Sequence, residues 1–100
     1  MTAPPFIIGA TREFGRVAAR IKKSDSGKYR KVQKTVRLLR DVGPRHPGLN
    51  SHKYSSFTGP NGEEVWESYV ENKTPGAWRL FWMYGPGAGM ITLISVGPHP

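Results

Sequence analysis

Two apolar runs near the end of the sequence determine its architecture: Trp78-Arg79-Leu80-Phe81-Trp82-Met83-Tyr84 and Met90-Ile91-Thr92-Leu93-Ile94-Ser95-Val96, with Gly85-Pro86-Gly87-Ala88-Gly89 between them. Aromatic and branched residues on both sides of a Gly/Pro turn predict a β-hairpin. Arg79 lies inside the first run, and His99 follows the second. A guanidinium cannot lose its proton to escape burial, so Arg79 needs an anionic partner. Both residues are therefore candidate site residues.

Alternation along residues 78–84 sorts this strand into two faces. One face carries Trp78, Leu80, Trp82 and Tyr84, and the other carries Arg79, Phe81 and Met83. We expect the first face to be the floor on which helices pack. Arg79 would then point to the open face, where a ligand could reach it.

Helical spacing dominates the first half of the chain. After Thr11, a suitable cap, the apolar residues that recur at helical spacing are Phe14, Val17, Ala18 and Ile21. This pattern predicts an amphipathic helix that ends in the polar run 24–27. A second helix, with Tyr29, Val32, Val36 and Leu39 on one side, is expected to stop at Gly43-Pro44.

The remaining segments complete a predicted sheet. Residues 6–8 predict a first strand, residues 43–53 an irregular connector, and residues 54–57, 64–71, 78–84 and 90–96 four further strands. Short connections between these four require antiparallel pairing. We therefore predict one α+β domain over residues 1–100, in which an N-terminal strand and a two-helix hairpin pack on a mostly antiparallel sheet of four to five strands.

Charge is concentrated in the predicted helices. The chain has a net charge of +8, and residues 11–45 hold 12 Lys and Arg against three acidic residues, which gives this segment +9. A field of this kind attracts RNA, DNA or an acidic protein. It also suits a solvated helix face that only keeps the protein in solution.

The composition argues against several kinds of site. The sequence has no cysteine, and its three histidines lack the His-x-x-x-His spacing of a helical metal site, so we predict no metal and no cofactor. No apolar run is long enough to cross a membrane, and the N-terminus lacks the features of a signal peptide. We expect a cytoplasmic protein that does not bind membranes.

Several short motifs, taken in order, resemble one known family. After the basic helices, they are Pro47-Gly48-Leu49, His52-Lys53, Thr58-Gly59, Trp66-Glu67-Ser68-Tyr69, Trp78-Arg79-Leu80 and Ile94-Ser95-Val96-Gly97-Pro98-His99. Together they resemble the RelE/ParE superfamily of toxins from type II toxin–antitoxin modules, over almost the whole chain.

The resemblance to the RelE-like branch, with its YoeB and HigB relatives, implies cleavage of mRNA on the translating ribosome. It implies mRNA, the ribosome with its rRNA, and a cognate antitoxin as partners. It places Arg79 at the family's phosphate-contacting arginine and His99 at a catalytic position after the last strand. Lys53, or His52 beside it, falls near basic residues that some members carry before the second strand.

The chemistry of RNA cleavage without a metal fits these residue types. The reaction must activate a 2′-hydroxyl, neutralise charge on the phosphoryl oxygens and protonate the leaving 5′-oxygen. Arg79 suits the second task, and Lys53 would add positive charge. His99 suits proton transfer because the ordinary pKa of histidine is about 6.5. Glu67 or Glu64 could serve as the base if the strand turns it inward.

RNA binding is assigned to basic and aromatic residues. The candidates are Arg30, Lys34, Arg37, Arg45, Tyr69 and Phe81. The four cations would contact phosphates, and the two aromatic side chains would stack on bases from the open face.

Alternatives remain open at the level of the sequence. Arg79 could form a salt bridge with Glu67 or Glu71 that has no catalytic meaning, and His99 could belong to a frayed terminus. Many relatives place a tyrosine after the position of His99, where this sequence has Pro100. The glutamate that some relatives hold before the second strand is replaced by Asn50-Ser51. A ParE-like inhibitor of DNA gyrase and a non-toxic basic nucleic-acid-binding domain are the competing functions.

Overall fold

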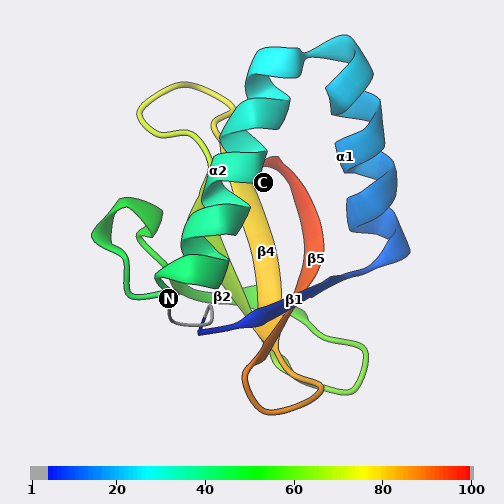
Figure 1. The fold of residues 1–100 in the computed structure, drawn as a ribbon, viewed down its shortest axis with the longest axis vertical. Coiled ribbons are helices and arrows are strands. Elements are labelled where there is room, and N and C mark those ends of the chain that lie inside the picture. Colours follow the sequence, from blue (N-terminus) through cyan, green and yellow to red (C-terminus); the bar gives the residue numbers. More distant parts are fainter. Residues whose placement is uncertain (1–4, 100) are drawn as a thin grey trace.

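The computed structural model describes residues 5–99. It consists of a five-stranded sheet with two helices on one face (Figure 1). The elements in chain order are β1 (Ile7–Ala10), α1 (Arg12–Ser24), α2 (Ser26–Asp41), a short 3-10 turn (Pro47–Leu49), β2 (His52–Thr58), β3 (Glu64–Tyr69), β4 (Trp78–Tyr84) and β5 (Met90–Pro98). The predicted α+β architecture is confirmed.

The strands lie in the order β1-β5-β4-β3-β2. Strands β2 to β5 pair with their sequence neighbours in antiparallel fashion, whereas β1 pairs with β5 in parallel. The parallel pair is possible because the chain between its strands is long and contains both helices. The first strand therefore joins the sheet at an edge.

Side-chain caps fix where the two helices begin. Thr11 accepts a hydrogen bond from the Phe14 N–H at 3.2 Å and donates one to the carbonyl oxygen of Ile94, which ties α1 to β5. Asp25 ends α1 and caps α2 by accepting from the Lys28 N–H. The predicted break over residues 24–27 is thus Asp25 alone. It can be this short because the Asp25 side chain caps α2, which begins at the next residue.

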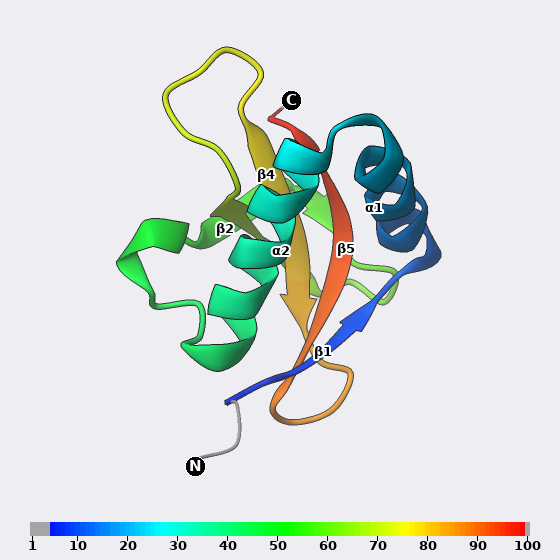
Figure 2. The ribbon, with the colours of Figure 1, turned by 45° about the horizontal axis from the view of Figure 1, so that its top comes forward.

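The main core lies between the helices and the sheet (Figure 2). Val32 and Leu39 of α2 pack with Leu80 and Trp82 of β4, and all four are buried. The indole N–H of Trp82 donates to the hydroxyl of Ser68 at 2.8 Å. The predicted alternation of β4 is confirmed, with the Leu80 and Trp82 side forming the floor for the helices.

The strand bounds differ from the predicted ones: β1 covers residues 7–10 instead of 6–8, and β3 ends at Tyr69 instead of residue 71. Strand β2 begins at His52 rather than at residue 54, so His52 belongs to the sheet and not to the connector. Strand β5 continues through Pro98, and the N–H of His99 donates to the carbonyl oxygen of Ala77 at 3.0 Å. His99 is consequently tied to the start of β4 and is not a frayed end.

Candidate active site

A buried carboxylate on the sheet face away from the helices gathers three basic side chains. Glu67 of β3 is 1% exposed. One of its oxygens, Oε1, lies 3.1 Å from Arg79 Nε, 3.3 Å from His99 Nδ1 and 3.6 Å from His52 Nε2. The sheet register explains the convergence, since His52 is directly opposite Glu67 on β2. The structure therefore brings together four of the five predicted catalytic residues.

The two histidines occupy the accessible rim of this cluster. Their side chains are 46% exposed for His52 and 48% exposed for His99. His52 Nδ1 donates to the carbonyl oxygen of Asn50 at 2.7 Å, so a protonated ring offers an N–H to two oxygens. The carboxylate beside His99 Nδ1 favours a proton on that nitrogen, which leaves Nε2 free to exchange protons.

Arg79 is more enclosed than the sequence suggests. It is 9% exposed, donates to Glu67 through Nε, and donates to the carbonyl oxygens of Glu71 and Trp78 through Nη1. The ring of Tyr69 lies 3.8 Å from its guanidinium carbon. The ion pair with Glu67, which the sequence left open as an alternative, is thus present, and the expected free access of a ligand to the guanidinium is wrong. Arg79 contributes a fixed positive charge beneath the two histidines.

Glu67 is likewise too buried to touch a substrate. Its second oxygen, Oε2, is buried and has no hydrogen-bond partner within residues 5–99. A buried carboxylate needs compensating cations, and here Arg79 and the histidines surround it. Glu67 can orient the imidazoles, whereas the hydroxyl of a substrate can reach only the histidines.

Lys53 lies outside this cluster. Because side chains alternate along a strand, Lys53 points to the opposite face from His52. Its Nζ is 3.1 Å from Glu64 Oε1 and 5.8 Å from the centre of the Trp66 ring. The structure gives no support to Lys53 or Glu64 as a member of the catalytic group.

Phe81 does not stack on RNA bases, contrary to the expectation from parity. It is 3% exposed because Tyr54 and Phe57 of β2 cover it, with ring centres 5.1 and 5.6 Å away. These two aromatic residues were missed by the sequence analysis. The signal for Tyr54 was its spacing of two residues from His52, which places both on one face once β2 is known to begin at His52. Tyr69 keeps its position on the open face, beside Arg79 and His52.

The basic candidates on α2 lie on the other side of the molecule. Arg30, Lys34 and Arg37 are exposed, and their helical spacing places them opposite the buried Val32 and Leu39. Arg45 is also exposed, in the connector that follows α2. The three α2 cations are therefore separated from Glu67 by the thickness of the sheet and of α2.

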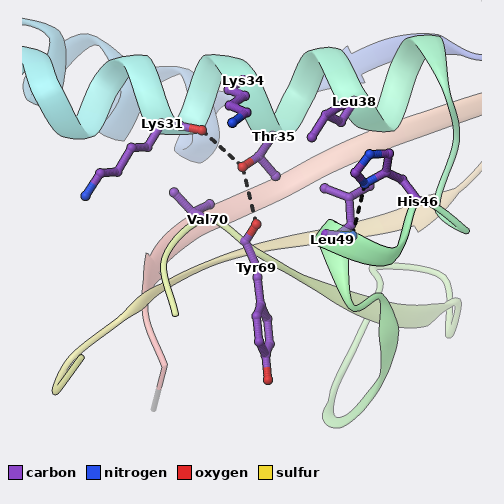
Figure 3. Close-up of a pocket in the computed structure, with 9 residues that line it drawn as sticks. Lys31, Lys34, Thr35, Leu38, His46, Leu49, Tyr69 and Val70 are labelled. Carbon is purple, nitrogen blue, oxygen red and sulfur yellow. Dashed lines mark hydrogen bonds between the residues drawn. The ribbon is translucent and has the colours of Figure 1, made fainter. Parts of the chain in front are cut away.

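A cleft of about 430 Å³ between α2 and the connector is shown in Figure 3. The hydroxyl of Thr35 is within hydrogen-bond distance of the carbonyl oxygens of Lys31 and Tyr69 and can donate to either. The ring of His46 accepts a hydrogen bond from the Gly48 N–H. The Tyr69 ring points away from the cleft, toward the opposite face of the sheet. These polar groups already have hydrogen-bond partners within the chain, and none of these hydrogen bonds involves a side chain of the Glu67 cluster.

The described residues contain no group of three His, Cys, Asp or Glu arranged to hold a metal ion. Near Glu67, the guanidinium of Arg79 already binds the shared oxygen and would repel a second cation. Over residues 5–99 no helix is both long and apolar enough to cross a membrane.

Comparison of the structure with solved structures reveals close similarity in fold. The YoeB dimer from Staphylococcus aureus superposes with a TM-score of 0.69 at 10% identity, covering 96% of this chain and 99% of that one. The fold is the RelE/YoeB toxin fold. RelE in the RelE–RelB complex from Pyrococcus horikoshii has a TM-score of 0.61 at 12% identity, covering 94% of both chains.

A third toxin-fold neighbour comes from the Escherichia coli DinJ–YafQ toxin–antitoxin complex. Its TM-score is 0.66 at 14% identity, and the match covers 95% of this chain and 93% of that chain. No protein-family model matches the sequence, and no curated protein is similar to it in sequence. The toxin fold is thus recognised through the structure.

Proposed function

We propose that this chain is the toxin of a type II toxin–antitoxin module and that it cleaves mRNA on the ribosome. The observation that carries the proposal is the group formed by His52, Glu67, Arg79 and His99, in which two accessible imidazoles flank a buried carboxylate and a buried guanidinium. Solved structures of this fold include toxins in complex with antitoxins, which supports a cognate antitoxin as partner.

The proposed reaction divides its proton transfers between the histidines. His99 Nε2 removes the proton of a 2′-hydroxyl, whose oxygen attacks the adjacent phosphorus. The bond from phosphorus to the 5′-oxygen breaks, and protonated His52 donates its Nε2 proton to that oxygen. His52 Nε2 is the nitrogen on the side of Glu67 Oε1, at 3.6 Å, while Nδ1 stays hydrogen-bonded to the carbonyl oxygen of Asn50. The products are a 2′,3′-cyclic phosphate and a 5′-hydroxyl end. Arg79 stabilises charge on the phosphoryl group, and Glu67 positions both rings.

Induced expression in a bacterium tests this proposal. The parent chain should stop growth and create new transcript ends that carry a 5′-hydroxyl. His99→Gln and Glu67→Gln should lower cleavage by purified protein about 100-fold or more, since positioned acid–base groups contribute roughly that much. Glu67→Gln should also change the pH profile of cleavage, because it alters the partner of both imidazoles.

His46→Gln is the matched control, as His46 lies in the connector away from the cluster. It should cleave like the parent. Growth arrest with DNA-damage signalling and no new RNA ends would instead assign the chain to gyrase inhibition. A parent chain that leaves growth unchanged would favour the non-toxic nucleic-acid-binding domain.

A further inference from the structure

An irregular stretch of β2 opens a cavity beside the candidate active site. Lys53 is opposite Trp66 and Thr58 is opposite Glu64, so β2 advances five residues while β3 advances two. The surplus chain bulges away from the ladder. It leaves a cavity of about 220 Å³ that is bounded by β2 and the start of β3.

One wall of this cavity is aromatic and leads directly to His99. Tyr54 and Phe57 line it, and their ring centres are 5.0 Å apart. Phe57 is 44% exposed, which is unusual for so large an apolar side chain. Tyr54 also contacts the His99 ring, with 6.1 Å between the ring centres. The aromatic surface is thus continuous with the group that would transfer protons.

Beside the aromatic wall, the polar lining of the cavity consists of two hydroxyls, which donate and accept, two carboxylates and one ammonium group. Ser55, Thr58 and Glu63 line it, while the charge of Lys53 is neutralised by Glu64. Hydrogen bonds from its own backbone N–H and from the Asn61 N–H hold the pKa of Glu63 below its ordinary value. Glu63 therefore presents an ionised carboxylate, which accepts hydrogen bonds and cannot donate them.

We propose that this cavity binds one unstacked base of the RNA, next to the phosphodiester held at His52 and His99, and that it prefers a base with an amino group over uracil. Aromatic side chains stack on bases, and carboxylates accept from the amino groups of guanine, adenine and cytosine. The inference rests on the proposed function. An apolar side chain of a protein partner would contact the aromatic wall alone, whereas a base with an amino group contacts both that wall and the Glu63 carboxylate.

Phe57 allows the test, because it does not belong to the Glu67 cluster. Ribosome-bound mRNAs that differ at single positions flanking the cleavage site, with guanine, uracil or an abasic residue, would be incubated with the parent and with Phe57→Leu. Leucine keeps apolar cover over Phe81 but removes the stacking face. The parent should lose about tenfold in kcat/KM when the bound base is abasic, as expected for one stacked base. Uracil should fall between guanine and the abasic residue.

Phe57→Leu should cleave intact RNA about tenfold less well and show no further loss with the abasic RNA, while Phe57→Trp should restore the dependence on the base. Tyr84→Leu, which removes another half-exposed aromatic side chain, should behave like the parent. If the abasic RNA lowers kcat/KM equally for the parent and for Phe57→Leu, the inference is overturned and the proposed function stays intact. A Phe57→Leu variant that weakens only antitoxin binding would have the same consequence. A folded parent that cleaves no ribosome-bound mRNA would overturn the proposed function itself, and the inference with it.

Discussion

Single buried polar groups on this sheet have specific partners. Ser68 is fully buried, and its hydroxyl accepts from the indole N–H of Trp82 and shares a 2.7 Å hydrogen bond with the hydroxyl of Ser51. One hydroxyl can do both, because it donates through its proton and accepts through a lone pair. A small residue at this position thus allows a large polar aromatic to lie in the core.

Replacing Ser68 should therefore cost more stability than replacing its partner. Ser68→Ala leaves the Trp82 N–H buried without an acceptor, and we expect it to lower the free energy of unfolding by about 1–3 kcal/mol. Ser51→Ala should cost less, because Ser68 keeps its bond to Trp82. Urea denaturation of both variants measures the difference. Equal losses would show that the indole N–H finds another acceptor.

At the scale of elements, Glu71 joins α2 to the sheet. It follows β3, lies 3.0 Å from Lys31 Nζ and 3.5 Å from Lys28 Nζ, and accepts from the Trp78 N–H at 3.2 Å. Partial burial alone would raise the pKa of Glu71. The hydrogen bonds from Lys31 and Trp78 and the charges of both lysines outweigh burial and hold the pKa below its ordinary value.

This contact should make part of the stability depend on pH. Because the pKa of Glu71 is lower in the folded chain than in the unfolded one, its contribution is present above the ordinary glutamate pKa of about 4.3 and is lost as the pH falls through the folded value. Between pH 6 and pH 3, Tm should therefore fall more steeply for the parent than for Glu71→Gln. If Tm falls equally with pH for the parent and Glu71→Gln, the charge of Glu71 does not contribute to stability.

The strands show what the sequence could predict and what it could not. Residues 78–84 form β4 as predicted, because an alternating aromatic run between turn residues encodes a strand locally. The sequence also named Glu67, Arg79, His52 and His99, although not their common oxygen. The burial of Phe81 and the position of Lys53 depend on the register and bulge of β2. Those arise from contacts between distant segments, which local alternation does not encode.

At the scale of the whole molecule, the sheet separates two surfaces. Both helices lie on one side of the sheet (Figures 1 and 2) and carry exposed cations, whereas the side chains of the His52–Glu67–His99 cluster lie on the opposite face. The predicted RNA-binding residues Arg30, Lys34 and Arg37 therefore cannot hold the same nucleotide as the histidines. Under the proposed function, they would contact a broad polyanion such as rRNA while the opposite face receives the mRNA.

The salt dependence of ribosome binding should test whether the cations of α2 contact rRNA. Arg30→Gln and Arg37→Gln should each weaken ribosome binding and reduce the slope of log affinity against log salt by about one. They should leave the pH profile of cleavage unchanged, because neither contacts the cluster. Lys73→Gln, an exposed loop cation outside the helices, is the control and should keep the slope of the parent. An unchanged slope in the arginine variants would exclude α2 from the ribosome interface.

Because the sheet lies between the helices and the cluster, a label on a helix would not cover the histidines. The chain has no cysteine, and Ala19 is exposed on α1. Ala19→Cys would create a unique attachment point for a fluorophore on the side away from His52 and His99. Single-molecule imaging could then follow arrival, residence and departure on a large target without the dye covering the histidines.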